Sequence, residues 1–285
     1  MYEVTLLLIL GFVYLAIASI QDIKKREVAN WLSFSLIIFA LAYRIFYSAF
    51  MNDWNFLVMG IIGLVIFVGL GFGLYYGRFF AGGDAKLIMG IGLVITVYST
   101  WQENTISIIT FIALMLLSGA VYGGIFSLAL ALKSKNNFKK EFSKLAKEKW
   151  GLIQLTIFLG IISLIVVFLT KEWSFLLLPV LIFILPWIYI YAKSVDEGCM
   201  IFQTPIEELT EGDWLYKDVE LSKEKIKANW EGLSKEEIEL IKKSKIKTVL
   251  VRRGIPFVPA IFIAFIIWLY LFLWNPLLVN RIFFL

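Results

Sequence analysis

Two aspartates, Asp22 and Asp84, are the residues of this chain whose placement most suggests chemistry. Asp22 closes the first apolar segment and Asp84 opens the fourth. A chain that leaves the membrane at Asp22 and crosses it twice is back on the same side at Asp84. Two carboxylates that meet at one depth cannot both ionise freely, so they can share a proton. The ionised member then activates water and the protonated member polarises a carbonyl, as in an aspartic protease.

The residues around the two aspartates fit that chemistry and also a simpler role. Gly82 and Gly83 precede Asp84, and glycine permits unusual backbone angles and close approach of another chain. We therefore expect an extended substrate to lie against this loop. Gly-Gly-Asp is, however, also a common turn and N-cap sequence. Asp22 beside the basic residues 24–26 is equally explained as a charge pair at the membrane interface.

The rest of the composition excludes several other chemistries. The 285 residues include one cysteine, Cys199, and no histidine. The chain therefore has no intrachain disulfide, no CxxC zinc site and no Ser-His or Cys-His nucleophile pair. We expect no metal and no cofactor. The net charge of +5 is better explained by where the charges lie than by nucleic-acid binding.

Apolar segments occupy most of the chain. Hydrophobic residues make up 60% of it, against about 45–50% in a soluble domain, and a run of roughly 18 or more can span a bilayer as a helix. The predicted spans are roughly Tyr2–Ile20, Trp31–Phe50, Phe56–Tyr76, Asp84–Thr100, Ile106–Leu132, Leu152–Thr170, Phe175–Tyr191 and Ile255–Trp274. The predicted fold class is therefore all-α, a polytopic helical membrane protein with about eight transmembrane helices.

The positive charges predict how these spans are oriented. Of the 27 Lys and Arg residues, all but Arg44, Lys171 and Arg281 fall in or beside the connections on the side that carries Asp22 and Asp84. Because positive residues remain in the cytoplasm, this predicts that both aspartates lie at the cytoplasmic face of the cell membrane. Both chain ends are then predicted outside.

One segment has soluble character. We predict a membrane helical bundle over residues 1–191, a cytoplasmic segment over 192–254 and a C-terminal transmembrane helix over 255–285. Within the cytoplasmic segment, Ser234 and Glu237 form a capping-box pattern. The apolar residues that follow among lysines predict an amphipathic helix, which would rest on anionic lipid headgroups or dock a substrate.

Three stretches of the chain resemble a known family in motif order. The stretch Asp22–Asn30 (DIKKREVAN) resembles the first aspartate motif of type IV prepilin peptidases, in which charged residues precede an Ile-Pro-Asn-like triplet. Ala81–Leu87 (AGGDAKL) resembles their second motif, GxGD. Arg253–Ala260 (RGIPFVPA) is similar to the start of the last helix in the archaeal branch, which processes prepilins and archaellins. Together these stretches are more specific than GGD alone.

The chain departs from the family pattern at several positions. Ala81 replaces the first glycine of GxGD, and Val28-Ala29 replaces Ile-Pro. With one cysteine, the chain lacks the CxxC zinc-binding insert of many bacterial relatives. We therefore expect no methyltransferase activity.

The resemblance implies an aspartic endopeptidase with Asp22 and Asp84 as the catalytic pair. It also implies a substrate loop at Gly82 and Gly83, and Asn30 and Lys86 are possible accessory residues. The substrate would be a precursor with a short basic leader, the class III signal peptide, ahead of a hydrophobic helix held in the lipid bilayer. Cleavage would occur at the cytoplasmic face.

Two other functions remain open from the sequence. Presenilin and signal-peptide-peptidase proteins also use GxGD, but their first aspartate lies within a helix and not at its end. A non-enzymatic transporter or assembly protein would use the aspartates to bind ions, although transporter sites usually lie near the midplane. Neither the particular precursor nor the oligomeric state follows from the sequence.

Overall fold

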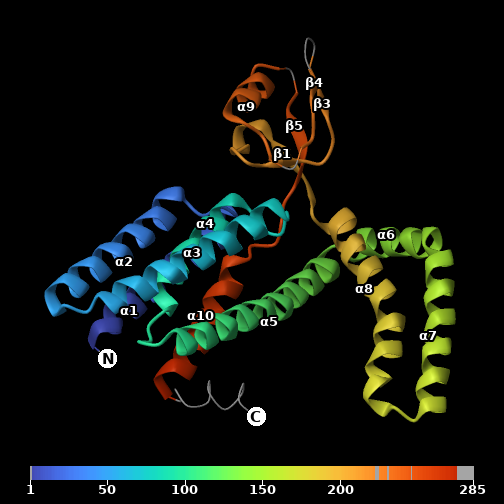
Figure 1. The fold of residues 1–285 in the computed structure, drawn as a ribbon. Helices are drawn as coiled ribbons and strands as arrows, with labels where there is room; N and C mark the ends of the chain where they lie inside the picture. Colours follow the sequence, from blue (N-terminus) through green and yellow to red (C-terminus); the bar gives the residue numbers. More distant parts are fainter. Residues whose placement is uncertain (1, 222–224, 230, 245, 275–285) are drawn as a thin grey trace. The chain divides into compact units, whose positions relative to one another are not determined.

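Long apolar helices dominate the computed structural model, which describes residues 2–221, 225–229, 231–244 and 246–274 (Figure 1). Six helical segments of the described chain are long and apolar enough to cross a membrane. They are α1 (Tyr2–Lys25), α2 (Asn30–Met51), α3 (Trp54–Tyr76), α5 (Trp101–Lys133), α7 (Trp150–Thr170) and α8 (Leu177–Cys199), the last preceded by the 3-10 turn η1 (Trp173–Leu176). The predicted class, a multi-pass membrane protein built of helices, is confirmed.

Two further apolar helices are shorter. These are α4 (Gly82–Ile95), with 14 residues, and α10 (Val258–Trp274), with 17. Each predicted span thus contains a helix, although residues 96–100 and 255–257 lie outside α4 and α10. A helix needs about 20 residues to cross the bilayer core. The prediction of eight crossings therefore stays a prediction. Arg281 and the end of the predicted C-terminal segment lie outside the described residues.

The described elements form two compact units. The first comprises the chain up to Gly124 and from Ile255 onward, and the second runs from Ile125 to Gly254. Helix α5 begins in the first unit and ends in the second. The predicted division at 191/192 and 254/255 stays a prediction.

Helix α4 lies at the centre of the first unit and packs against α1, α2 and α3. Ten of its 14 residues are buried. A Cβ added to Gly63 of α3 would lie 2.4 Å from the carbonyl oxygen of Gly92 in α4, so glycine is needed for the two backbones to meet. Small residues commonly allow such close helix packing in membranes. The burial of α4 fixes the position of Asp84, which lies in its first turn.

The other end of α4 is held by a buried arginine, Arg44 of α2. Its guanidinium donates to the carbonyl oxygen of Leu93 at 3.0 and 2.8 Å and to that of Thr96 at 2.6 Å. It also donates to the carbonyl oxygen of Phe56 in α3. The last carbonyls of a helix lack partners within it, and a cation is favoured there by the helix dipole. Arg44 therefore joins α2, α3 and the end of α4.

Helix α10 packs along α1 and beside α5. The rings of Phe12 and Phe262 meet edge to face at 5.2 Å between centroids. Ser118 of α5 donates to the carbonyl oxygen of Ala260 at 2.8 Å. A Cβ on Gly119 would lie 2.5 Å from the ring of Phe257, so this ring fills the notch at that glycine. These contacts position the start of α10.

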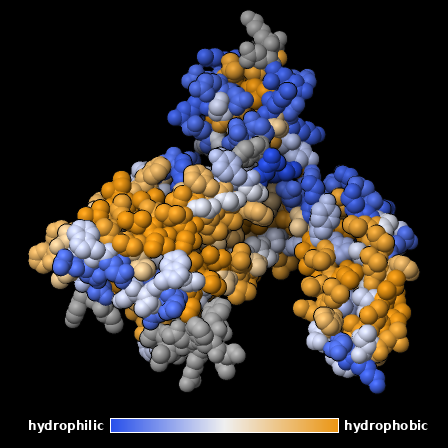
Figure 2. Space-filling view, viewed as in Figure 1, coloured by the Kyte–Doolittle hydropathy of each residue, from blue (hydrophilic) through white to orange (hydrophobic). Residues whose placement is uncertain are grey.

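The second unit contains a helical part. Helices α7 and α8 pack side by side, and the short helix α6 (Lys135–Glu148) packs on α8 (Figure 1). No helix was predicted for the α6 region, which lies between two predicted spans. Figure 2 shows that apolar residues cover α7 and α8 while polar residues gather over α6.

The segment after α8 folds as a small domain with strands that were not predicted. A three-stranded antiparallel sheet has the order β1 (Ile201–Pro205), β5 (Thr248–Arg252), β2 (Trp214–Leu215), and β3 (Val219–Glu220) pairs with β4 (Lys225–Ile226). The predicted capping box and amphipathic helix are confirmed in α9 (Lys235–Lys242). Ile238 and Ile241 are buried in the domain's own core. The expectation that this face rests on lipid is therefore wrong.

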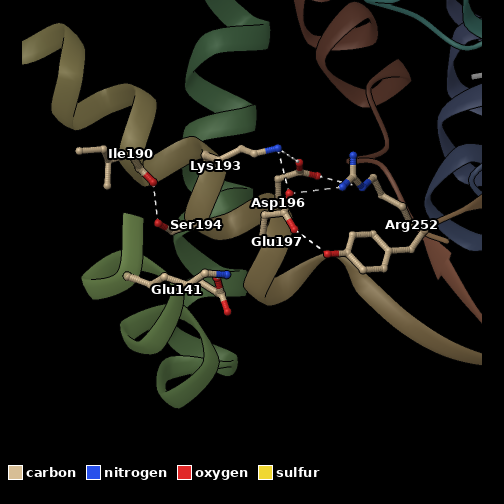
Figure 3. Close-up of polar contacts among 9 residues, drawn as sticks. Glu141, Ile190, Lys193, Ser194, Asp196, Glu197 and Arg252 are labelled. Atoms are coloured by element: carbon tan, nitrogen blue, oxygen red, sulfur yellow. Dashed lines mark hydrogen bonds and ion pairs between the residues drawn. The ribbon is translucent and has the colours of Figure 1, made fainter. Parts of the chain in front are cut away.

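Charged residues connect this domain to the end of α8 (Figure 3). Arg252 of β5 forms ion pairs with Asp196 at 3.4 Å and with Glu197 at 3.7 Å. Lys193 pairs with Glu197 at 2.9 Å. Tyr216 also donates to Glu197 at 2.8 Å, and this hydrogen bond raises the pKa of the Tyr216 hydroxyl.

Candidate active site

Asp22 lies in the last turn of α1 and is buried, with 3% of its surface exposed. The helix ends just beyond it because Arg26 adopts a left-handed conformation with φ of 56°. The Arg26 N–H closes this turn by donating to the carbonyl oxygen of Asp22 at 2.8 Å. The chain therefore turns away directly after the aspartate, as predicted for a residue at a helix end.

The Asp22 carboxylate accepts a hydrogen bond from the start of α10. The N–H of Val258 donates to its Oδ2 at 2.9 Å, and the N–H of Phe257 also contributes. The first N–H groups of a helix have no partner within it, so Asp22 caps α10 from a position 236 residues earlier in the chain. These donors favour the ionised carboxylate and so offset part of the cost of burying its charge.

The loop after Asp22 is held by a neighbouring side chain. Gln21 accepts a hydrogen bond from the N–H of Ala29 at 3.2 Å. Val28 is buried, with 2% exposed. The segment that follows the first aspartate is therefore an ordered part of the unit, although Val28-Ala29 replaces the Ile-Pro of the family pattern.

Asp84 is the third residue of α4 and is also buried, with 9% exposed. Ala81 at the N-cap has φ of −68° and ψ of 158°, which alanine adopts without strain. Gly82 and Gly83 have no positive φ either. The expectation that these glycines provide unusual backbone angles is wrong, and alanine at position 81 fits the loop.

The two motifs touch at Gly83. A Cβ added there would lie 2.9 Å from the carbonyl oxygen of Val28, whereas one added to Gly82 would meet nothing closer than Tyr75 at 3.6 Å. Gly83 is thus the position at which close approach requires glycine, and the chain that approaches is the protein's own first motif. Lys86 strengthens the junction, since its Nζ donates to Asn30 Oδ1 at 2.7 Å.

The two carboxylates differ in their surroundings. Helix α1, which bears Asp22, packs against α4, which bears Asp84. No group in the described part of the chain hydrogen-bonds to the Asp84 carboxyl, whereas Asp22 has backbone donors. This arrangement can hold one ionised and one protonated carboxyl. Within the described residues, no cluster of His, Cys, Asp or Glu is suited to a metal ion.

The partners that fix Asp22 were not predicted. The stretch that contains Phe257 and Val258 carried only a resemblance, and no role was predicted for Gln21. Prolines at 256 and 259 mark a helix start, but nothing in the sequence pairs that start with Asp22.

Comparison with known proteins finds a family to which the part of the chain that holds this site is similar. A model of the type IV leader peptidase family matches residues 9–128. The chain is 37% identical over 91 residues to the preflagellin peptidase of Methanocaldococcus jannaschii, covering 32% of this chain and 38% of that protein. It is 32% identical over 87 residues to the preflagellin peptidase of Methanococcus maripaludis, covering 30% of this chain and 37% of that protein.

A third preflagellin peptidase, from Methanococcus voltae, is 31% identical over 90 residues, covering 32% of this chain and 38% of that protein. The matched stretch thus spans well under half the length of these relatives. No solved structure matches the chain. The resemblance carried by the two aspartate motifs is confirmed, since the stretch that matches the type IV leader peptidase family contains both Asp22 and Asp84.

Proposed function

We propose that the chain is a membrane-embedded aspartic endopeptidase that removes the short basic leader from pilin- or archaellin-like precursors. The observation that carries this proposal is the junction of the two motifs, where Gly83 packs on Val28 and Lys86 binds Asn30. This junction brings the helix ends that bear Asp22 and Asp84 together. The family of residues 9–128 and the names of the relatives support leader removal as the reaction.

The unequal surroundings of the two aspartates suggest their roles. Ionised Asp22, stabilised by the start of α10, accepts a proton from water as the oxygen attacks the scissile carbonyl carbon. Protonated Asp84 donates to the carbonyl oxygen and stabilises the charge that develops there. When the tetrahedral intermediate collapses, Asp22 returns its proton to the leaving amine and Asp84 regains its own from the intermediate.

The charge distribution supports a site at the cytoplasmic face. The loops on the side of Asp22 and Asp84 carry most of the basic residues of the chain, and such loops stay in the cytoplasm. A precursor whose apolar helix lies in the bilayer would present its leader junction at this level.

The test is cleavage of a precursor with a basic leader and an apolar helix by the full chain in lipid vesicles, with product masses measured. We expect one cut, at the leader–helix junction. A cut within the apolar helix would instead favour the presenilin-like function. Ion flux through the vesicles without any cut would favour a transporter.

The pH dependence of cleavage gives a second readout. Activity should fall on the acid side as Asp22 becomes protonated, and on the alkaline side as Asp84 loses its proton. The rate should therefore pass through a maximum. A rate that rises steadily with pH would contradict the division of roles.

A further inference from the structure

A groove in the second unit lies between α6 and the neighbouring helices α7 and α8, away from both aspartates in the sequence. The groove is open along much of its surface, with a volume of about 670 Å³. The groove is lined by residues of α6, by Trp150 at the start of α7 and by Trp187 of α8.

The groove combines a basic edge with an aromatic floor. Lys139, Ser143 and Lys147 line it at spacings of four residues, so they share one face of α6. The two lysines are eight residues apart, which is about 12 Å along a helix. On the neighbouring face Phe142 stacks on Trp187, with ring centroids 6.4 Å apart and planes 20° from parallel.

Two lysines near the groove are held in ion pairs within the chain. Lys144 pairs with Glu141 at 3.1 Å and Lys149 pairs with Glu148 at 3.0 Å. Lys139 and Lys147 form no ion pair with any residue that the structure describes. Their positive charges are thus available to an anion from outside the protein.

The position of α6 in the chain indicates that the groove lies near membrane lipid. Helix α6 connects α5 and α7, and both are long and apolar enough to cross a membrane. A helix that joins two spans lies at one surface of the bilayer, whichever way they are oriented. Tryptophan is enriched at that level because its ring is apolar and its N–H is polar.

We propose that this groove is a binding site for one anionic phospholipid, with the phosphate between Lys139 and Lys147 and the upper acyl chain against Phe142 and Trp187. Ser143, between the two lysines, can donate to a phosphate oxygen. The two lysines favour an anionic headgroup over a zwitterionic one. The aromatic floor favours an intact lipid over a free phosphate ester.

The test uses the purified full chain in detergent, titrated with phosphatidylglycerol or phosphatidylcholine brominated on the acyl chains, with tryptophan quenching as the readout. The variant Trp150→Phe/Trp187→Phe keeps the aromatic floor but removes both local reporters. The difference in quenching between this variant and the unchanged protein gives the signal of the two tryptophans in the groove. We expect tighter binding of phosphatidylglycerol.

The charge contribution is measured with two matched double variants. Because each basic residue near an anionic headgroup raises binding about fivefold, Lys139→Gln/Lys147→Gln should weaken phosphatidylglycerol binding about 30-fold. The control, Lys140→Gln/Lys144→Gln, removes the same charge from the same helix outside the groove and should leave binding nearly unchanged. Glycerol phosphate should not displace the lipid.

Three results would overturn the proposal. Equal binding of the two lipids would mean ordinary contact with bulk lipid. An equal loss of affinity for phosphatidylglycerol in both double variants would mean a diffuse attraction of the lipid to the whole helix. Displacement by glycerol phosphate would mean a site for free phosphate esters.

Discussion

The end of α1 and the start of α4 each present a buried aspartate, but the two regions hold it in different ways. Asp22 is fixed through its carboxylate, which accepts N–H donors at the start of α10. Asp84 is fixed through its helix. Gly83 packs on Val28 at one end of α4, and Arg44 binds the last carbonyls at the other.

This difference suits a pair of unlike roles. A carboxylate that accepts backbone hydrogen bonds is prepared to stay ionised. A buried carboxyl without a protein partner can keep its proton and donate it to a substrate. The comparison therefore predicts that substitutions which loosen α4 affect Asp84, whereas loss of the Asp22 carboxylate affects α10 as well.

The largest effect on stability is expected at Arg44. Arg44→Leu leaves buried carbonyls of α3 and α4 without a donor, and we expect it to lower the free energy of unfolding by about 3–5 kcal/mol. Arg44→Lys keeps the charge but not the forked geometry, so its free energy of unfolding should lie between those of Arg44→Leu and the unchanged protein. Thermal unfolding in detergent micelles measures both. If Arg44→Leu unfolds at the same temperature as the unchanged protein, α4 is held by other contacts.

Alanine substitutions at the two glycines beside the junction of the motifs should have different effects. In Gly83→Ala the new Cβ would lie 2.9 Å from the Val28 carbonyl oxygen, and such overpacking costs about 1–3 kcal/mol. We expect slower cleavage as Asp84 is displaced from Asp22. Gly82→Ala is the matched control, because its Cβ has room at 3.6 Å. Equal rates for the two variants would show that the junction does not position the site.

Loss of the Asp22 carboxylate should affect stability as well as cleavage. Asp22→Ala removes the cap of α10, and a lost helix cap costs about 1 kcal/mol. Asp22→Asn keeps an acceptor oxygen and should be more stable than Asp22→Ala. Asp84→Ala removes a carboxyl without a protein hydrogen bond and should not lower the unfolding temperature. If Asp84→Ala lowers the unfolding temperature as much as Asp22→Ala does, the proposed difference between the two regions is contradicted.

The smallest effect is expected at the exposed bond between Lys86 and Asn30. We expect a coupling energy of about 0.5–1.5 kcal/mol from the cycle of Lys86→Met and Asn30→Ala, measured by unfolding. Asn30→Asp can still accept from Lys86 and serves as the conservative control. A coupling energy of zero would show that this bond adds nothing to the junction.

The sequence predicted the helices that carry the site, because long apolar runs leave few alternatives. It also predicted that Asp22 and Asp84 lie at helix ends on one side, since counting crossings requires no tertiary contact. The capping box at Ser234 and Glu237 could also be predicted from the sequence, because both partners lie within one turn.

The remaining features depend on contacts between distant segments. Nothing local marks Val258 as the donor to Asp22, or Val28 as the neighbour that requires glycine at position 83. Arg44 looked like a charge near the outer face, yet it is fully buried and caps α4. The strands β2, β3 and β4 were missed because two residues each are too few to show an alternating pattern.

The central claim is that Asp22 and Asp84 act together as the two catalytic carboxyls. The most direct measurement is the rate of leader removal by Asp22→Asn and Asp84→Asn proteins, each first shown to unfold cooperatively. An amide cannot accept the proton from water or hold the proton of a carboxyl. We therefore predict that neither variant cleaves the precursor. Cleavage at the unchanged rate by either variant would contradict the account.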